Sequence, residues 1–107
     1  MKRLDFLGDS LRRLREFPAG VRKEAGVQLH KVQLELEPSD WKPMPTVGSG
    51  VREIRLRDTD GAFRVIYVAA FEEAVYVLHA FQKKTQQTAK RDLDLAHARL
   101  QQLVRSR

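Results

Sequence analysis

Two neighbouring segments in the second half of the chain carry apolar residues on both of their alternating faces. Residues 62–70 read Ala-Phe-Arg-Val-Ile-Tyr-Val-Ala-Ala, residues 74–81 read Ala-Val-Tyr-Val-Leu-His-Ala-Phe, and the intervening turn contains Glu72-Glu73. Branched and aromatic residues favour strands, and a strand that is apolar on both faces is covered on both. These segments therefore predict two central strands, in a sheet that other elements must cover on each side.

A third strand is predicted just before this pair. Residues 51–57 alternate in character, with Ile54 and Leu56 on one face and charged side chains on the other, which is the pattern of a strand with one solvated face. Asp58-Thr-Asp-Gly61 is a hairpin turn that joins this strand to the next segment. Residues 2–6 are a candidate for a short edge strand.

Three further segments have the periodicity of helices. The first covers about residues 10–16, the second covers residues 21–37 and ends at Pro38, and the third begins at Thr88, a plausible N-cap. Between the second helix and the strands, residues 38–50 are rich in Pro and Gly and predict a loop. The buried stripes of the two longer helices are expected to be Val21, Ala25, Leu29, Val32 and Leu36, and Ala89, Leu93, Ala96, Leu100 and Leu103.

This order of elements predicts one α+β domain that spans residues 1–107. The sheet is small and antiparallel, the two N-terminal helices cover one face, and the C-terminal helix lies on or across the other. A length of 107 residues suits a single compact domain.

Composition and charge narrow the function. The chain has no cysteine, which excludes disulfides, thiolate catalysis and cysteine-rich zinc sites. Its formal net charge of +6 is typical of a domain that meets a polyanion or an acidic partner, although such a charge also serves solubility alone. The start of the chain lacks a signal-peptide pattern and the longest apolar run, 65–71, is too short to span a bilayer, so we expect a cytoplasmic protein.

Basic residues are expected to converge at the ends of the three strands. Arg55 and Arg57 lie on the polar face of the first strand, Arg64 begins the second, and the third ends at Lys83 and Lys84. Neighbouring strands in a sheet are about 5 Å apart. A meander of these strands therefore brings the five cations into one cluster.

Arg64 is the unusual member of this cluster. Its neighbours on the same strand face, Ile66 and Val68, are apolar, and a buried charge without a partner costs several kcal/mol. One interpretation is that Arg64 serves function, in which case Arg64→Ala keeps or raises the stability of the fold. The alternative is a structural ion pair with Glu53 or Glu72.

Such a cluster suits phosphate chemistry. Arginine forks onto phosphate oxygens, and crowded cations lower the pKa of a lysine, which then helps to deprotonate a ribose 2′-hydroxyl without a metal or other cofactor. His79, close to Lys83 in the sequence, is a second candidate acid or base, or else a packed histidine. The cations of the last helix are typical of a solvated face, or else they extend an RNA footprint; they are Lys90, Arg91, Arg99, Arg105 and Arg107. Of these, Lys90 and Arg91 are the predicted RNA-binding residues.

Three stretches of the strand sequence, taken in order, carry a family resemblance. They are Gly50-Val-Arg-Glu-Ile-Arg55, Ala62-Phe-Arg-Val-Ile-Tyr67 and Val77-Leu-His-Ala-Phe-Gln-Lys-Lys-Thr-Gln-Gln-Thr88, of which the last is the most specific. Together with the helices they resemble the RelE/HigB toxin superfamily, and more narrowly its branch of phage-derived Gp49-like proteins. The resemblance covers nearly the whole chain. It implies a small antiparallel sheet flanked by helices, and a ribosome-dependent endoribonuclease that cuts messenger RNA.

The resemblance also suggests roles for individual residues. Arg55 and Arg64 match basic residues of the family's first two central strands, and they are expected to bind phosphate and the transition state. Lys83 matches the basic residue just after the third strand, with Lys84 as its neighbour. Glu53 departs from the pattern, because RelE has a lysine there, and the last helix lacks the tyrosine that some branches use.

We therefore expect a type II toxin, an mRNA interferase that inhibits translation. Proton transfer is assigned to Lys83 or His79, and RNA docking to Arg57 and Lys84. The expected partners are the ribosome, messenger RNA and a neutralising antitoxin of the helix-turn-helix type, with no membrane, metal or cofactor. Two alternatives remain from the sequence: a non-enzymatic, ParE-like inhibitor of DNA gyrase, and an inactive relic that only binds its antitoxin.

Overall fold

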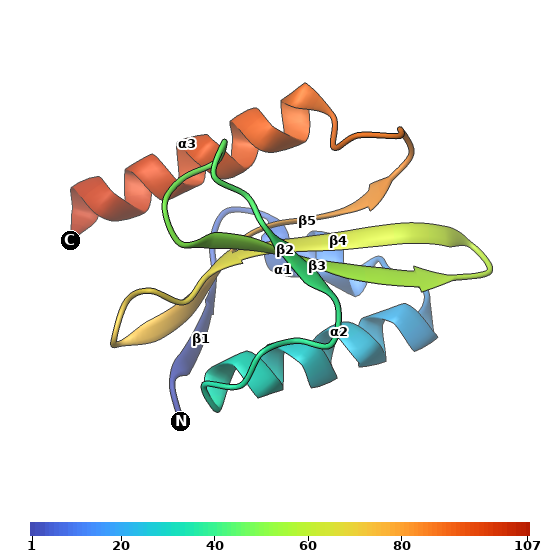
Figure 1. Cartoon of the computed structure of the whole chain (residues 1–107), viewed down its shortest axis with the longest axis horizontal. Coiled ribbons are helices and arrows are strands. Elements are labelled where there is room, and N and C mark those ends of the chain that lie inside the picture. The colour runs from blue at the N-terminus through green and yellow to red at the C-terminus, as the bar shows by residue number, and fades with distance from the viewer.

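The computed structural model describes all 107 residues and contains one five-stranded sheet and three helices (Figure 1). The strands lie in the order β1-β5-β4-β3-β2, with β1 parallel to β5 and every other pair antiparallel. The predicted α+β class is confirmed, with β4 and β5 inside the sheet and β1 at an edge. The elements in chain order are β1 (Arg3–Phe6), α1 (Ser10–Arg15), α2 (Ala19–Gln33), β2 (Trp41–Pro43), β3 (Val51–Asp58), β4 (Gly61–Val68), β5 (Ala74–Lys83) and α3 (Lys90–Ser106).

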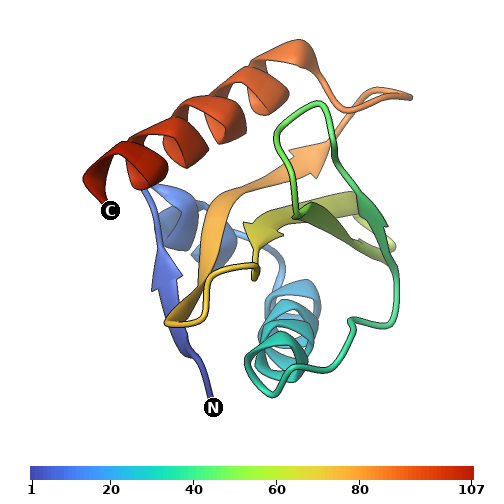
Figure 2. The ribbon, with the colours of Figure 1, turned by 60° about the vertical axis from the view of Figure 1, so that its left-hand side comes forward.

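The sheet separates two hydrophobic cores. On one face, α1 and α2 contribute Leu14 and Leu29, which pack with Val65 of β4. On the other face, α3 contributes Ala96, which packs in a cluster with Ile66. Figures 1 and 2 show α2 and α3 on opposite sides of the sheet. Complete burial of an aliphatic side chain contributes about 1.5–3 kcal/mol, so both cores hold the sheet in place. No helix of the chain is long and apolar enough to cross a membrane.

A bulge in β5 changes which side chains point toward α3. The pairing of β4 with β5 shifts register between Ile66 and Tyr67, so that Ile66 pairs with His79 and Tyr67 pairs with Val77. The extra residue, Leu78, joins the core under α3, and the neighbouring His79 hydrogen-bonds a residue of α3. A bulge places two consecutive side chains on one face, which is how β5 remains apolar on both of its faces.

Helix α2 ends at Gln33, four residues before the predicted end at residue 37. Glu35 has a positive φ of 63°. Its N–H donates to the carbonyl of Val32, and the Leu36 N–H donates to the carbonyl of Lys31. These two bonds satisfy the last carbonyls of the helix and stop it before Pro38 is reached. The predicted burial of Leu36 is therefore wrong, since 58% of Leu36 is exposed.

The segment 38–50, predicted to be a loop, contains a short strand, β2. β2 pairs with β3, with Trp41 opposite Ile54 and Pro43 opposite Arg52. Proline is acceptable there because β2 is an edge strand. The guanidinium of Arg52 lies 4.0 Å from the centre of the Trp41 ring, so a cation–π contact adds to the pairing of the two strands.

Helix α3 begins at Lys90, and its N-cap position is Ala89. Thr88, the predicted cap, instead donates from its hydroxyl to a carboxylate oxygen of Glu53 at 3.1 Å. The predicted apolar stripe is otherwise in place, with Ala96 and Leu103 buried. The segment between β5 and α3 is thereby attached to the middle of β3.

Candidate phosphate-binding site

Four of the five basic residues that were predicted to converge meet on the face of the sheet that α3 covers. Arg55 pairs with Arg64 across β3 and β4, and Arg64 pairs with Phe81 of β5. One step along the same face, Arg57 pairs with Ala62, and Ala62 pairs with Lys83. Because paired residues on adjacent strands lie about 5 Å apart and point the same way, the four cations form one cluster. We call Arg55, Arg57, Arg64 and Lys83 the cationic cluster.

Arg64 lies at the buried centre of the cationic cluster. It is only 5% exposed. Its Nη1 donates to the backbone carbonyl of Phe63 at 2.9 Å, and its Nε lies 3.5 Å from Oε1 of Glu53. Burial lowers the pKa of Arg64 below its ordinary value, while the negative charge of Glu53 opposes that change. Of the two structural partners considered from the sequence, Glu53 is therefore the one that Arg64 contacts.

A hollow of about 260 Å³ opens beside Arg64. It is lined by Asp40, Leu56 and the three arginines of the cationic cluster. Arg55 forms one wall and is held by Asp40, with its Nη2 2.8 Å from Oδ1 of that carboxylate. Arg57 is exposed beside it. Convergent guanidinium groups around a hollow of this kind are donors for phosphate oxygens.

Lys83 closes the cationic cluster at the end of β5. Burial lowers its pKa below the ordinary lysine value, and the charge of Arg64 lowers it further, against a smaller opposing effect of Glu53. A lysine with a lowered pKa carries a larger neutral fraction near neutral pH and can accept a proton. Lys84, the next residue, is exposed.

Glu53 is the acidic residue at the centre of these cations, and its side chain is completely buried. Its Oε1 lies 3.9 Å from Nζ of Lys42 as well as close to Arg64. Lys42 was not predicted as a site residue because it lies in β2, which was expected to be loop. The signal that could have indicated the strand is Pro43, since the residue before a proline prefers an extended conformation.

His79 does not lie on the accessible surface of the site. It is 0% exposed, its ring stacks on Phe81 at 4.9 Å, and its Nε2 lies 2.8 Å from Oδ1 of Asp92 on α3. Burial lowers the pKa of His79, against the opposing effect of Asp92. In this arrangement His79 connects β5 with α3 and is enclosed by protein, so we propose Lys83 alone for proton transfer.

The predicted footprint residues flank the cluster. Lys84, Lys90 and Arg91 are exposed, and Lys90 pairs with Asp94 at 2.7 Å. They belong to the segment and the first turn of α3 that follow β5, and the bond from Thr88 keeps this segment beside the cluster. Their contact with RNA stays a prediction.

Arg99 is not on a solvated face as the sequence suggested. Its Nη1 donates to the carbonyl of Leu78 at 2.9 Å, and its Nη2 donates to the Asp9 carboxylate at 2.5 Å. Arg99 thereby joins α3 to β5 and to the start of α1. The hydrogen bond from Arg99 lowers the pKa of Asp9.

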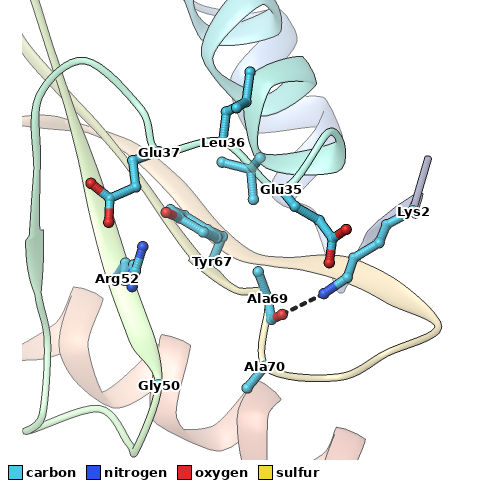
Figure 3. A pocket seen from close by; sticks show the side chains of 10 residues that line it. Lys2, Glu35, Leu36, Glu37, Gly50, Arg52, Tyr67, Ala69 and Ala70 are labelled. Atoms are coloured by element: carbon cyan, nitrogen blue, oxygen red, sulfur yellow. Dashed lines mark hydrogen bonds between the residues drawn. The ribbon is translucent and has the colours of Figure 1, made fainter.

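A separate cavity of about 350 Å³ lies at the other end of β4 (Figure 3). Lys2, Glu37, Arg52 and Tyr67 are among its lining residues, and the hydroxyl of the buried Tyr67 has no hydrogen-bond partner. None of the residues predicted from the sequence as site residues lines this cavity. It is therefore distinct from the hollow beside Arg64.

Comparisons with known proteins agree with this architecture. The profile of the family described as "Phage derived protein Gp49-like (DUF891)" matches residues 12–101. Among solved structures, the chain is similar to a mutant of the E. coli toxin RelE in the free state, with a TM-score of 0.65 and 17% sequence identity over 95% of this chain and 97% of that chain. At this identity the likeness concerns the fold alone. No curated protein matches the chain.

Proposed function

Because the chain belongs to the phage-derived Gp49-like family and has the fold of the toxin RelE, we propose that it is the toxin of a type II toxin–antitoxin system. In this proposal it acts as a metal-independent endoribonuclease that cuts messenger RNA on the ribosome in the cytoplasm. The observation that supports it best is the cationic cluster, in which Arg64 lies at the foot of a hollow with Arg55 and Arg57 around it. This arrangement suits a phosphate that carries extra negative charge in a transition state.

The proposed reaction is an internal transfer at one phosphodiester. The neutral amine of Lys83 accepts the proton of a ribose 2′-hydroxyl, whose oxygen attacks the adjacent phosphorus. The bond from phosphorus to the 5′-oxygen breaks, that oxygen takes a proton from water, and a 2′,3′-cyclic phosphate remains. Arg64 and Arg55 stabilise the charge on the reacting phosphate, and the lowered pKa of Lys83 favours the proton-accepting form.

Binding is assigned to the cations around the hollow. Arg57 and Lys84 dock the RNA backbone, Lys90 and Arg91 extend the footprint along α3, and Lys42 adds a further cation from β2. Each neutralised phosphate releases counterions and strengthens binding at low salt. The neutralising partner is proposed to be a helix-turn-helix antitoxin.

The test combines growth with RNA end mapping. Expression of the protein alone should stop growth and translation, and co-expression of its antitoxin should restore both. Purified protein should cut ribosome-bound messenger RNA and leave cyclic phosphate ends. Lys83→Met should lower the cleavage rate by about a hundredfold, whereas Lys23→Met, which removes an exposed lysine from α2, should change it little.

Two results would count against the proposal. Normal growth at verified high levels of folded protein would refute the toxin function. Growth arrest with intact messenger RNA but inhibited supercoiling by DNA gyrase would instead support the ParE-like alternative.

A further inference from the structure

We infer that Glu53 is a positioning residue of the cationic cluster, which holds Arg64 in the orientation that receives the phosphate. The inference rests on the proposed function and adds to it a residue that itself does not touch RNA. Glu53 is completely buried, beneath the cations that line the hollow. Glu53 can therefore affect RNA only through the side chains that it contacts.

Burial of the Glu53 carboxylate requires compensating contacts. An ionised carboxylate in a protein interior is stable only with opposite charges and hydrogen bonds around it. Oε2 accepts a hydrogen bond from Thr88 at 3.1 Å. Oε1 lies 3.5 Å from Nε of Arg64 and 3.9 Å from Nζ of Lys42. The two oxygens thus face different groups, and Oε1 is the one turned toward the cluster.

The contact with Glu53 also orients Arg64. A guanidinium is planar, so contacts to two of its nitrogens fix its orientation. Nε faces Glu53 and Nη1 donates to the carbonyl of Phe63. Nη2 makes no hydrogen bond within the protein and belongs to a side chain that lines the hollow. A donor fixed in this way needs no reorganisation when charge develops on the phosphate.

Glu53 also affects the charge on Lys83. Glu53 favours the protonated form of Lys83, in opposition to burial and to Arg64. Loss of the Glu53 charge therefore lowers the pKa of Lys83 further. The part of the pH profile of cleavage that reports Lys83 should move to lower pH.

A positioning role of Glu53 and simple neutralisation of charge predict different effects of its removal. Removing the anion makes the cluster more positive, so RNA should bind more tightly. Loss of the fixed orientation of Arg64 should at the same time slow the chemical step. If Glu53 served only to reduce repulsion among the cations, tighter binding would leave the rate of cleavage unchanged.

The experiment compares Glu53→Gln with Glu72→Gln, which removes the same charge from the exposed turn between β4 and β5. Binding is measured with a short 2′-O-methyl RNA, which cannot be cut, and cleavage is measured on ribosome-bound messenger RNA as kcat and KM over a range of pH. NMR of the Nε–H group of Arg64 reports its orientation independently of activity.

We expect Glu53→Gln to bind the RNA two- to fivefold more tightly, to lose at least tenfold in kcat without a rise in KM, and to shift the pH profile toward lower pH. The Arg64 Nε–H signal should move or broaden, whereas Glu72→Gln should match the parent. Unchanged kcat, or an unchanged Arg64 signal, overturns the inference.

If Glu53→Gln does not fold, Thr88→Val takes its place. Thr88→Val removes no charge, so RNA binding should stay the same. It removes the hydrogen bond to Oε2 of Glu53, so kcat should fall, and an unaffected kcat again overturns the inference. A parent protein that cuts no RNA would refute the proposed function, and the Arg64 signal would still decide the role of Glu53.

Discussion

Replacement of Arg64 by alanine separates the structural and the catalytic contributions of the buried ion pair. The variant removes the guanidinium and leaves Glu53 buried, with Oε1 facing only Lys42 at 3.9 Å. Breaking a buried pair by removal of one partner costs about 3–5 kcal/mol. From the sequence alone, the functional interpretation of Arg64 predicted an unchanged or higher stability, whereas the ion-pair alternative predicted a loss. The contact with Glu53 favours the loss.

The geometry places the cost below that range. The Arg64–Glu53 contact is 3.5 Å long, and neither Nε nor Oε1 completes a hydrogen bond. The variant also avoids the desolvation of the guanidinium itself. We therefore expect a loss of about 2 kcal/mol in the free energy of unfolding, which for a domain of this size lowers Tm by about 8 °C.

The assay is a double-mutant cycle of the parent, Arg64→Ala, Glu53→Gln and the combined variant. Unfolding by urea and heat measures the coupling between the two charges. The combined variant should regain at least half of the lost stability, because neither charge remains buried alone. Cleavage should nevertheless stay about a hundredfold or more below the parent. Arg105→Ala, at an exposed position near the end of α3, is the control.

Two outcomes would refute this reasoning. If Arg64→Ala is as stable as the parent, the contact with Glu53 carries no energy and the ion pair is not formed in solution. If Arg64→Ala folds and cleaves at the rate of the parent, the assignment of Arg64 to the reacting phosphate is wrong.

Three further predictions follow from charge and burial. RNA affinity should fall steeply with salt, since several cations neutralise phosphates; a flat dependence between low and physiological salt would favour a protein partner over RNA. Cleavage should persist in a chelator selective for transition metals, and recovery by one added metal after complete loss would contradict the proposed mechanism. Burial lowers the pKa of His79 below 6.5, with Asp92, Arg13 and Arg99 as the charged groups that act on it. The unfolded chain then binds a proton at this histidine more readily than the folded chain does. The free energy of unfolding is therefore highest above pH 6.5 as far as His79 is concerned, and it declines as pH falls below 6.5. His79→Gln should flatten this decline in urea unfolding measured across pH. An unaltered slope would show that His79 does not cause the decline.

The sheet and the cationic cluster follow from sequence patterns that are local. Two-sided apolar character placed β4 and β5 inside the sheet, and alternation placed Arg55 and Arg57 on one face of β3. Once those strands pair, the position of Lys83 is a consequence of the register. The convergence of these cations was predictable because each pairing joins strands that are consecutive in the chain.

Features that depend on distant contacts were not predictable. β2 has only three residues and pairs through a connection rich in Pro and Gly, so no periodicity marks it. The early end of α2 depends on the positive φ of Glu35, a conformation that its residue type does not indicate. The partners of Arg99 lie in other elements, and solvated helical arginines have the same sequence pattern. The hydrogen bond that Thr88 donates to the buried Glu53 likewise joins residues that are 35 positions apart.

The parallel pairing of β1 with β5 has a consequence for how the chain folds during synthesis. Arg3 lies opposite Ala74 and Phe6 opposite Val77, and the Ser10 hydroxyl bonds to the carbonyl of Val77. The first strand therefore has no place in the sheet until more than two thirds of the chain has been made. At roughly 5–20 residues per second, β1 waits for several seconds for its partner, and β4 lacks one of its two neighbours during that time. Since β5 also ends with Lys83, a nascent chain of this protein cannot assemble its cationic cluster until β5 has been made and has paired with β4.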